Sequence, residues 1–163
     1  MTEFTFFWET ESPFSQWHPS PFQNQNGVYF KTAEQYMMWA KAILFNDHQT
    51  AQKILKTHNP RDQKALGREV KGFDSDIWNT HKYAIVYQGN KLKFLQNSIL
   101  LAALLHTQGT ELVEASPYDP VWGIGLKADD PKAQNKNTWQ GENLLGLVLT
   151  ELREEIIKFM YGQ

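Results

Sequence analysis

The chain contains no cysteine, which excludes disulfides, thiolate zinc sites and cysteine nucleophiles. It has no apolar run near the ~18 residues that a membrane-spanning helix needs. Its first segment, Met1–Trp8, lacks the basic start and the cleavage site of a secretory signal. The formal net charge of −2 argues against a dedicated binder of the DNA backbone, which is usually basic. We therefore expect a cytoplasmic protein that does not contact a membrane.

Common metal and nucleotide motifs are missing as well. The five histidines show neither H-x-H nor H-E-x-x-H spacing, so a catalytic zinc site is not expected. The sequence has no G-x-S-x-G, Walker or Rossmann glycine pattern, and the pair Gly123 and Gly125 alone is too weak a signal. We expect the protein to need neither a metal nor another cofactor.

The chain does have enough apolar residues for a folded domain. Of its 163 residues, 41% are hydrophobic and 13% aromatic, which excludes a disordered chain. At roughly 100–200 residues per domain, we expect a single domain over residues 1–163. The residue pattern predicts a predominantly helical α+β fold with a few short strands.

The N-terminal half is predicted to hold short strands and several capped helices. Thr32 and Gln35 form a T-x-x-Q capping box at the start of the first helix. Asn59-Pro60 is typical of a capped helix with proline at its first position. The predicted elements are strands at Thr5–Trp8 and Gly27–Phe30, an ordered loop between them, and helices from Thr32, at His48–Thr57, from Pro60 to Leu66, and from Asp74 or Ser75, with an interruption at Gly89–Asn90.

In the C-terminal half, Ser98–Thr107 is almost entirely apolar, which predicts the central buried helix. A strand is expected at Glu111–Ala115 and a last helix at about Asn143–Met160. Between them, Ser116–Glu142 shows little periodicity, and so long a stretch inside a compact domain is usually functional or mobile.

Glu34 and Lys41 are the first candidates for chemistry. Seven residues place them about 10 Å apart along a helix on nearly the same azimuth. Their neighbours Met37 and Met38 are poor surface residues, so we expect both charges to point into a cleft. Burial raises the pKa of a carboxylic acid and lowers that of an amine, which suits a general acid and a nucleophile. The alternative is a solvated helix flank.

The segment Glu114–Gly125 has the composition of a ligand-binding loop. Glycines such as Gly123 let backbone N–H groups approach an anion, and Trp122 offers a stacking face. Asp119 adds a second carboxylate beside Glu114. The alternative is a tight turn anchored by a buried tryptophan.

Three further interpretations stay open. Arg68 is either a clamp for phosphate or carboxylate or an ordinary surface arginine. Asn143 is most simply a helix N-cap, and a helix N-terminus also attracts anions. A carboxylate pair among Glu34, Glu114 and Asp119 leaves O-glycoside hydrolysis possible.

Six sequence blocks in a fixed order carry a family resemblance. One of them is Thr32-Ala-Glu-Gln-Tyr-Met-Met-Trp-Ala-Lys-Ala42. The chain is identified as a member of the NADAR (NAD- and ADP-ribose-associated), or YbiA-like, family over nearly its whole length. The other blocks are Ser12–Phe22, Leu66–Val70, Lys93–Asn97, Leu112–Leu126 and Trp139–Gly146.

The resemblance implies a helical α+β domain with N-glycosidase activity and no metal or redox cofactor. It implies two substrate classes: phosphoribosylamino-pyrimidine intermediates of riboflavin biosynthesis, and guanine bases that carry ADP-ribose in nucleic acid. In both, ribose C1 is joined to an exocyclic amine, and such an aminal can open to an imine. We expect one chemistry to serve both.

The resemblance also implies roles for individual residues. Glu34 is expected to donate a proton, Lys41 to attack C1 and form a Schiff base, and Asp119 to orient the sugar or activate water. The expected substrate contacts are Trp122, Arg68, Asn143, Gly123 and Phe14.

This scheme contains a conflict over the protonation of Lys41. A nearby carboxylate raises the pKa of a lysine, whereas a nucleophilic lysine must be neutral, so burial has to dominate. If Glu34 and Lys41 simply form an ion pair, Lys41 is an electrostatic aid and water attacks directly.

One departure from the family pattern bears on the substrate. Ile124 follows the Trp-Gly pair, where the riboflavin-intermediate members can carry an acidic residue. A basic stripe of Lys127, Lys132 and Lys136 either suits a longer anionic substrate or is an ordinary solvated loop. Both features slightly favour ADP-ribosylated substrates.

Two rival functions belong to other classes. A non-catalytic module that binds ADP-ribose or a nucleotide would use Arg68, Trp122 and Asn143 and would not need Glu34 or Lys41. A helical interaction domain without a small ligand would expose the aromatic residues of Ser12–Phe22 as a flat patch.

Overall fold

The computed structural model describes residues 2–162, which form a predominantly helical α+β structure as the sequence predicts. The chain divides into two compact units. One unit holds the residues up to Ser15 together with those from Ser98 onward, and the other is Gln16–Asn97. Within residues 2–162, no helix is long and apolar enough to cross a membrane.

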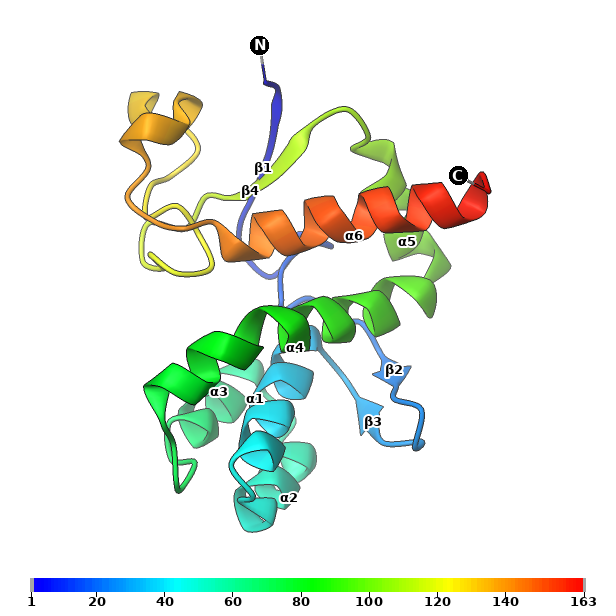
Figure 1. Cartoon of the computed structure of the whole chain (residues 1–163), viewed down its shortest axis with the longest axis vertical. Coiled ribbons are helices and arrows are strands. Elements are labelled where there is room, and N and C mark those ends of the chain that lie inside the picture. The colour runs from blue at the N-terminus through cyan, green and yellow to red at the C-terminus, as the bar shows by residue number, and fades with distance from the viewer. Residues whose placement is uncertain (1, 163) are drawn as a thin grey trace. The chain divides into compact units, whose positions relative to one another are not determined.

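The unit Gln16–Asn97 is built around one central helix, α1 (Ala33–Leu44) (Figure 1). Three further helices pack against it: α2 (His48–Lys56), α3 (Pro60–Gly67) and α4 (Ser75–Leu95). A small antiparallel hairpin precedes α1 and consists of β2 (Phe22–Gln23) and β3 (Tyr29–Phe30). The sequence predicted these helices and β3, but placed β2 inside a loop.

The start of α1 shows half of the predicted capping box. The Thr32 hydroxyl accepts a hydrogen bond from the Gln35 backbone N–H at 3.1 Å. The Gln35 side chain does not return the bond to Thr32: its oxygen accepts from the Lys31 backbone N–H at 2.7 Å, and its nitrogen donates to the Ile54 carbonyl at 3.1 Å. Through these bonds, the buried Gln35 side chain links the start of α1 to the end of α2.

Asp47 joins the start of α2 to the segment between α3 and α4. Its carboxylate accepts hydrogen bonds from the Lys71 backbone N–H at 2.9 Å, the Thr50 backbone N–H at 3.0 Å and the Thr50 hydroxyl at 2.6 Å. These bonds lower the pKa of Asp47 to about 2, and the bond from Lys71 has the largest effect. The N-cap of α2 therefore also fixes the loop that follows α3.

The predicted interruption at Gly89–Asn90 is wrong, because α4 is continuous over 21 residues. A Cβ at Gly89 would lie 2.5 Å from Cδ1 of Tyr36. The glycine is therefore explained by the close approach of α4 to α1, not by a break in the helix.

In the other unit, α6 (Leu144–Met160) packs against strand β4 of a two-stranded parallel sheet (Figure 1). Strand β1 (Phe4–Phe7) pairs with β4 (Glu111–Glu114), with Phe4 opposite Glu111. On the other side of β4, the Thr150 hydroxyl of α6 accepts from the Leu112 backbone N–H at 3.0 Å. A Cβ at Gly146 would lie 2.1 Å from the Leu112 carbonyl oxygen, so only glycine allows this approach. The sequence predicted β1, β4 and α6 closely.

The prediction of a central buried helix at Ser98–Thr107 is wrong. The helix α5 (Ser98–His106) buries only Leu104 fully, and Ile99 is 84% exposed. An all-apolar pattern does not show which side of a helix is covered, whereas α6 has one apolar stripe and buries it. The buried apolar residues of α6 are Leu145, Val148, Leu149, Leu152 and Ile156.

The segment predicted as irregular, Ser116–Glu142, is tied down by backbone hydrogen bonds. The Ile124 N–H donates to the Glu114 carbonyl at 2.9 Å, and the Gln140 N–H donates to the Ile124 carbonyl at 2.8 Å. Two short 3-10 helices lie within it, η1 (Pro131–Gln134) and η2 (Lys136–Thr138).

Candidate active site

Three of the predicted site residues, Glu34, Lys41 and Arg68, come together in the unit Gln16–Asn97. Glu34 lies in the first turn of α1 and is only 3% exposed. Lys41 lies in the last turn of the same helix and is half-buried, and Arg68 ends α3, which packs on α1. The charges of Glu34 and Arg68 both act on the Lys41 ammonium. The solvated-flank alternative therefore does not describe α1.

The pKa of Lys41 lies below that of an ordinary lysine. Burial is the largest cause and lowers the pKa, the carboxylate of Glu34 raises it, and the positive charge of Arg68 lowers it again. The sequence left open whether burial or the carboxylate dominates. In the structure burial dominates, which favours the neutral amine that a nucleophile requires.

Two aromatic rings beside Lys41 were not predicted. The Lys41 ammonium nitrogen lies 4.7 Å from the centre of the Phe73 ring and 5.6 Å from that of Trp78. Phe73 belongs to the loop after α3, and Trp78 to the first turns of α4. Sequence periodicity shows which residues share a helix face, but not which loop folds over a helix end.

A second unusual lysine, Lys93, was also missed. It lies in α4, is 0% exposed, and burial lowers its pKa to about 7. Its ammonium nitrogen lies 4.9 Å from the centre of the Phe94 ring. Its position inside one of the six family blocks was the only hint in the sequence. A lysine is almost never fully buried unless it is paired, so its residue type alone predicts an exposed side chain.

The remaining predicted residues lie in the other unit, where the structure gives several of them packing roles. One carboxylate oxygen of Asp119 accepts from the backbone N–H groups of Val121 at 3.0 Å and Trp122 at 2.9 Å, so Asp119 shapes the turn that carries the half-buried Trp122. A Cβ at Gly123 would lie 2.9 Å from the Glu114 carbonyl oxygen. The tight-turn interpretation of this segment is thus supported, and ligand contacts of these residues stay predictions.

Asn143 stands at the predicted N-cap position of α6, but its side chain does not cap the helix. Its backbone is left-handed, with φ 54°, and its side chain turns to β4. The oxygen accepts from the Glu114 backbone N–H at 2.9 Å, and the nitrogen donates to the Leu112 carbonyl at 3.1 Å. Asn143 therefore acts like a neighbouring strand, and an expected N-cap becomes a sheet-edge partner.

We expect Asn143→Ala to lower the free energy of unfolding by about 2–5 kcal/mol. The substitution removes both bonds of a 2%-exposed side chain, leaves two backbone groups without that partner, and places alanine in a left-handed conformation. Urea unfolding followed by circular dichroism measures the change, with the exposed Asn137→Ala as control. A change below about 0.5 kcal/mol in Asn143→Ala would contradict this role.

Other predicted contacts also face the interior or are engaged elsewhere. Phe14 is 7% exposed, and its ring makes an edge contact with Phe7 at 5.7 Å. Ile124 is 0% exposed in an apolar cluster, so its difference from an acidic residue reflects packing. The Lys136 ammonium lies 2.6 Å from a carboxylate oxygen of Glu111, which removes one charge from the predicted basic stripe. The two features that favoured ADP-ribosylated substrates are therefore weakened.

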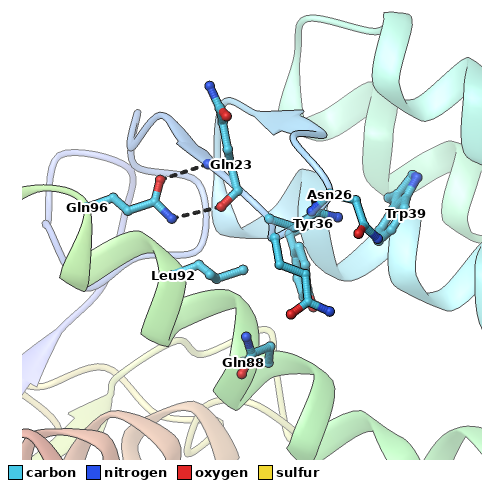
Figure 2. A pocket seen from close by; sticks show the side chains of 9 residues that line it. Gln23, Asn26, Tyr36, Trp39, Gln88, Leu92 and Gln96 are labelled. Carbon is cyan, nitrogen blue, oxygen red and sulfur yellow. Dashed lines mark hydrogen bonds between the residues drawn. The ribbon is translucent and has the colours of Figure 1, made fainter.

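A groove of about 500 Å³ uses another part of α1 (Figure 2). Tyr36 and Trp39 line it, and at about 100° per residue they lie on the opposite side of the helix from Glu34 and Lys41. The Gln96 side chain pairs with both backbone groups of Gln23, at 2.9 and 2.8 Å. The groove contains no charged residue, so it is separate from the charged cluster. Its lining is Gln23, Asn24, Gln25, Asn26, Tyr36, Trp39, Gln88, Leu92 and Gln96.

The donor set for a metal is limited. Over residues 2–162, no group of three or more histidine, aspartate or glutamate side chains is placed to hold a metal ion.

The helical α+β fold agrees with the comparisons with known proteins. A model of the NADAR domain family matches residues 6–157. The chain belongs to this NADAR family.

Relatives and a solved structure agree with this assignment. "N-glycosidase R617" of Acanthamoeba polyphaga mimivirus is 47% identical over 146 residues, which cover 87% of this chain and 86% of that protein. "Riboflavin biosynthesis protein PYRR, chloroplastic" of Zea mays is 32% identical over 161 residues, which cover 92% of this chain and 24% of that protein. The NMR structure of the Escherichia coli protein YbiA matches with a TM-score of 0.80 at 26% identity and covers 100% of this chain and 90% of that one.

Proposed function

We propose that this protein is an N-glycosidase that cleaves the bond between ribose C1 and an exocyclic amine of a base. As a member of a family whose curated relatives are named N-glycosidases, it is a hydrolase of N-glycosyl bonds. The observation that carries the finer proposal is the pairing on α1 of buried Glu34 with Lys41, whose pKa burial lowers. A binding module would not need this pair.

Lys41 is the nucleophile in this proposal. The neutral amine attacks ribose C1, the bond from C1 to the exocyclic nitrogen breaks, and the base leaves as a neutral amine after it receives a proton from Glu34. The attached sugar opens when its ring oxygen takes up the proton that the lysine nitrogen loses, which gives a Schiff base. Water then adds to C1 and releases lysine and the free sugar. The whole reaction consumes one water molecule. The proton released when water adds to C1 returns Glu34 to its acid form.

Arg68 supplies a permanent positive charge beside the reacting groups. Its guanidinium suits a phosphate on the ribose, and both expected substrate classes carry one. Its charge also disfavours the protonated form of Lys41. Binding a phosphate would neutralise part of that effect, so substrate and lysine protonation are coupled.

The test compares two substrates at equal concentration. One is an oligonucleotide with ADP-ribosylated guanine and the other is a phosphoribosylamino-pyrimidine, with base release followed by chromatography. Release from either one supports the N-glycosidase and identifies its substrate class. Binding of either substrate without release would contradict the proposal and favour a binding module.

A further inference from the structure

The loop between α3 and α4 is fixed against the end of α1. The Lys71 backbone N–H donates to Asp47, and Gly72 has φ +77°, a conformation that favours glycine. The Phe73 ring then packs on the Phe45 ring with 5.3 Å between their centres. The position of Phe73 therefore follows from bonds made by its neighbours.

Phe73 remains 46% exposed, yet one face of its ring lies over the Lys41 ammonium. Trp78 contributes a second ring from α4, and both rings are within the ~6 Å at which cation–π attraction is effective. This attraction stabilises the ammonium and not the neutral amine. It therefore opposes the effect of burial on the same nitrogen.

The charged surroundings of Lys41 come from two elements. Glu34 acts on it from its own helix, and Arg68 from the end of α3. The loop and α4 contribute the rings of Phe73 and Trp78. Of the described residues on α2 and β3, which also pack on α1, no charged side chain acts on the Lys41 ammonium.

We propose that Phe73, anchored through Asp47, is a positioning residue that sets the pH at which the Lys41 amine begins to attack, because its ring face favours the ammonium while its apolar cover favours the neutral amine. The role in attack rests on the proposed function, whereas the effect on protonation does not. Phe73 is thus a regulator of the nucleophile and makes no bond to the reacting atoms.

Two substitutions at Phe73 separate the ring from the cover that it provides. Phe73→Leu keeps most of the apolar cover and removes the ring face, so we expect Lys41 to titrate at lower pH. The neutral fraction below its midpoint then rises about two- to fivefold. Phe73→Ala removes the cover as well, and because burial is the larger influence, the midpoint moves to higher pH. The two variants are expected to change in opposite directions.

The titration is followed directly by NMR of the full chain with its lysines carbon-13 dimethylated, with the Lys41 signal assigned through Lys41→Arg. Tyr29→Leu is the matched control, because Tyr29 is 52% exposed and belongs to β3. Asp47→Ala loses the acceptor for the Lys71 N–H and should shift the midpoint upward like Phe73→Ala. If Phe73→Leu does not fold, Trp78→Leu takes its place. It removes the second ring, and we expect it to lower the Lys41 midpoint.

The outcomes separate this inference from the proposed function. A midpoint in Phe73→Leu that is unchanged or higher overturns the positioning role, even if base release continues. A lower midpoint supports it, even if neither of the two substrates reacts. In that case only the proposed N-glycosidase function fails.

Discussion

The Lys41→Ala variant is expected to lose about 10³-fold or more in the rate of base release and to form no covalent adduct with the sugar. Lys41 is half-buried near Glu34 and Arg68, and its pKa is lowered chiefly by burial. Alanine removes the attacking nitrogen and leaves α1 intact, since Lys41 contributes to the C-cap only through its backbone carbonyl, which alanine keeps. Single-turnover base release, quantified by chromatography, measures the loss.

The control for Lys41→Ala is Lys53→Ala, which removes an exposed lysine of α2 in the same unit. We expect it to react at the wild-type rate. The wild-type rate should also begin to rise with pH, as Lys41 loses its proton, at lower pH than for an ordinary lysine. A Lys41→Ala rate within tenfold of wild type would show that water attacks directly and that Lys41 only assists by its charge.

The Glu34→Gln variant is expected to lose about 10²- to 10⁴-fold in turnover and to keep substrate affinity. Glutamine has the size of glutamate but cannot donate a proton to the leaving amine. Glu34 is almost completely buried, so the substitution changes its chemistry without changing an exposed surface. Turnover and binding are measured separately, by base release and by calorimetry with the slow variant.

Glu69→Gln is the control for this experiment, because Glu69 is exposed and directly follows Arg68. It should change neither turnover nor binding. If Glu34→Gln also leaves turnover unchanged, the general acid is another group. If the wild type itself binds substrate without turnover, Glu34→Gln has nothing to lose and the chain is a binding module.

Local signals in the sequence predicted much of the fold. Thr32, Asn59 and Asp74 stand at the predicted caps, and each accepts a backbone hydrogen bond from the first turn of its helix. These contacts are between residues two or three positions apart, so a single sequence reveals them. The pair Glu34 and Lys41 was found for the same reason, because helical periodicity places both on one side of α1.

The errors arose where distant segments meet. Gly89 suggested a break in α4 but makes room for Tyr36 of α1, and Asn143 suggested a cap but bonds to β4. Phe73 was overlooked because its place over Lys41 depends on Asp47, a residue 26 positions earlier. Pairing between segments so far apart is not encoded in any local pattern, so only the structure reveals it.

The central claim is that Lys41 attacks the ribose, and borohydride trapping tests it most directly. Wild-type protein is incubated with each of the two substrates, reduced with borohydride and weighed intact. We predict a mass increase equal to the sugar moiety with at least one substrate, located at Lys41 by peptide mapping and absent in Lys41→Ala. Base release without any adduct would contradict the covalent role and leave water as the attacking group.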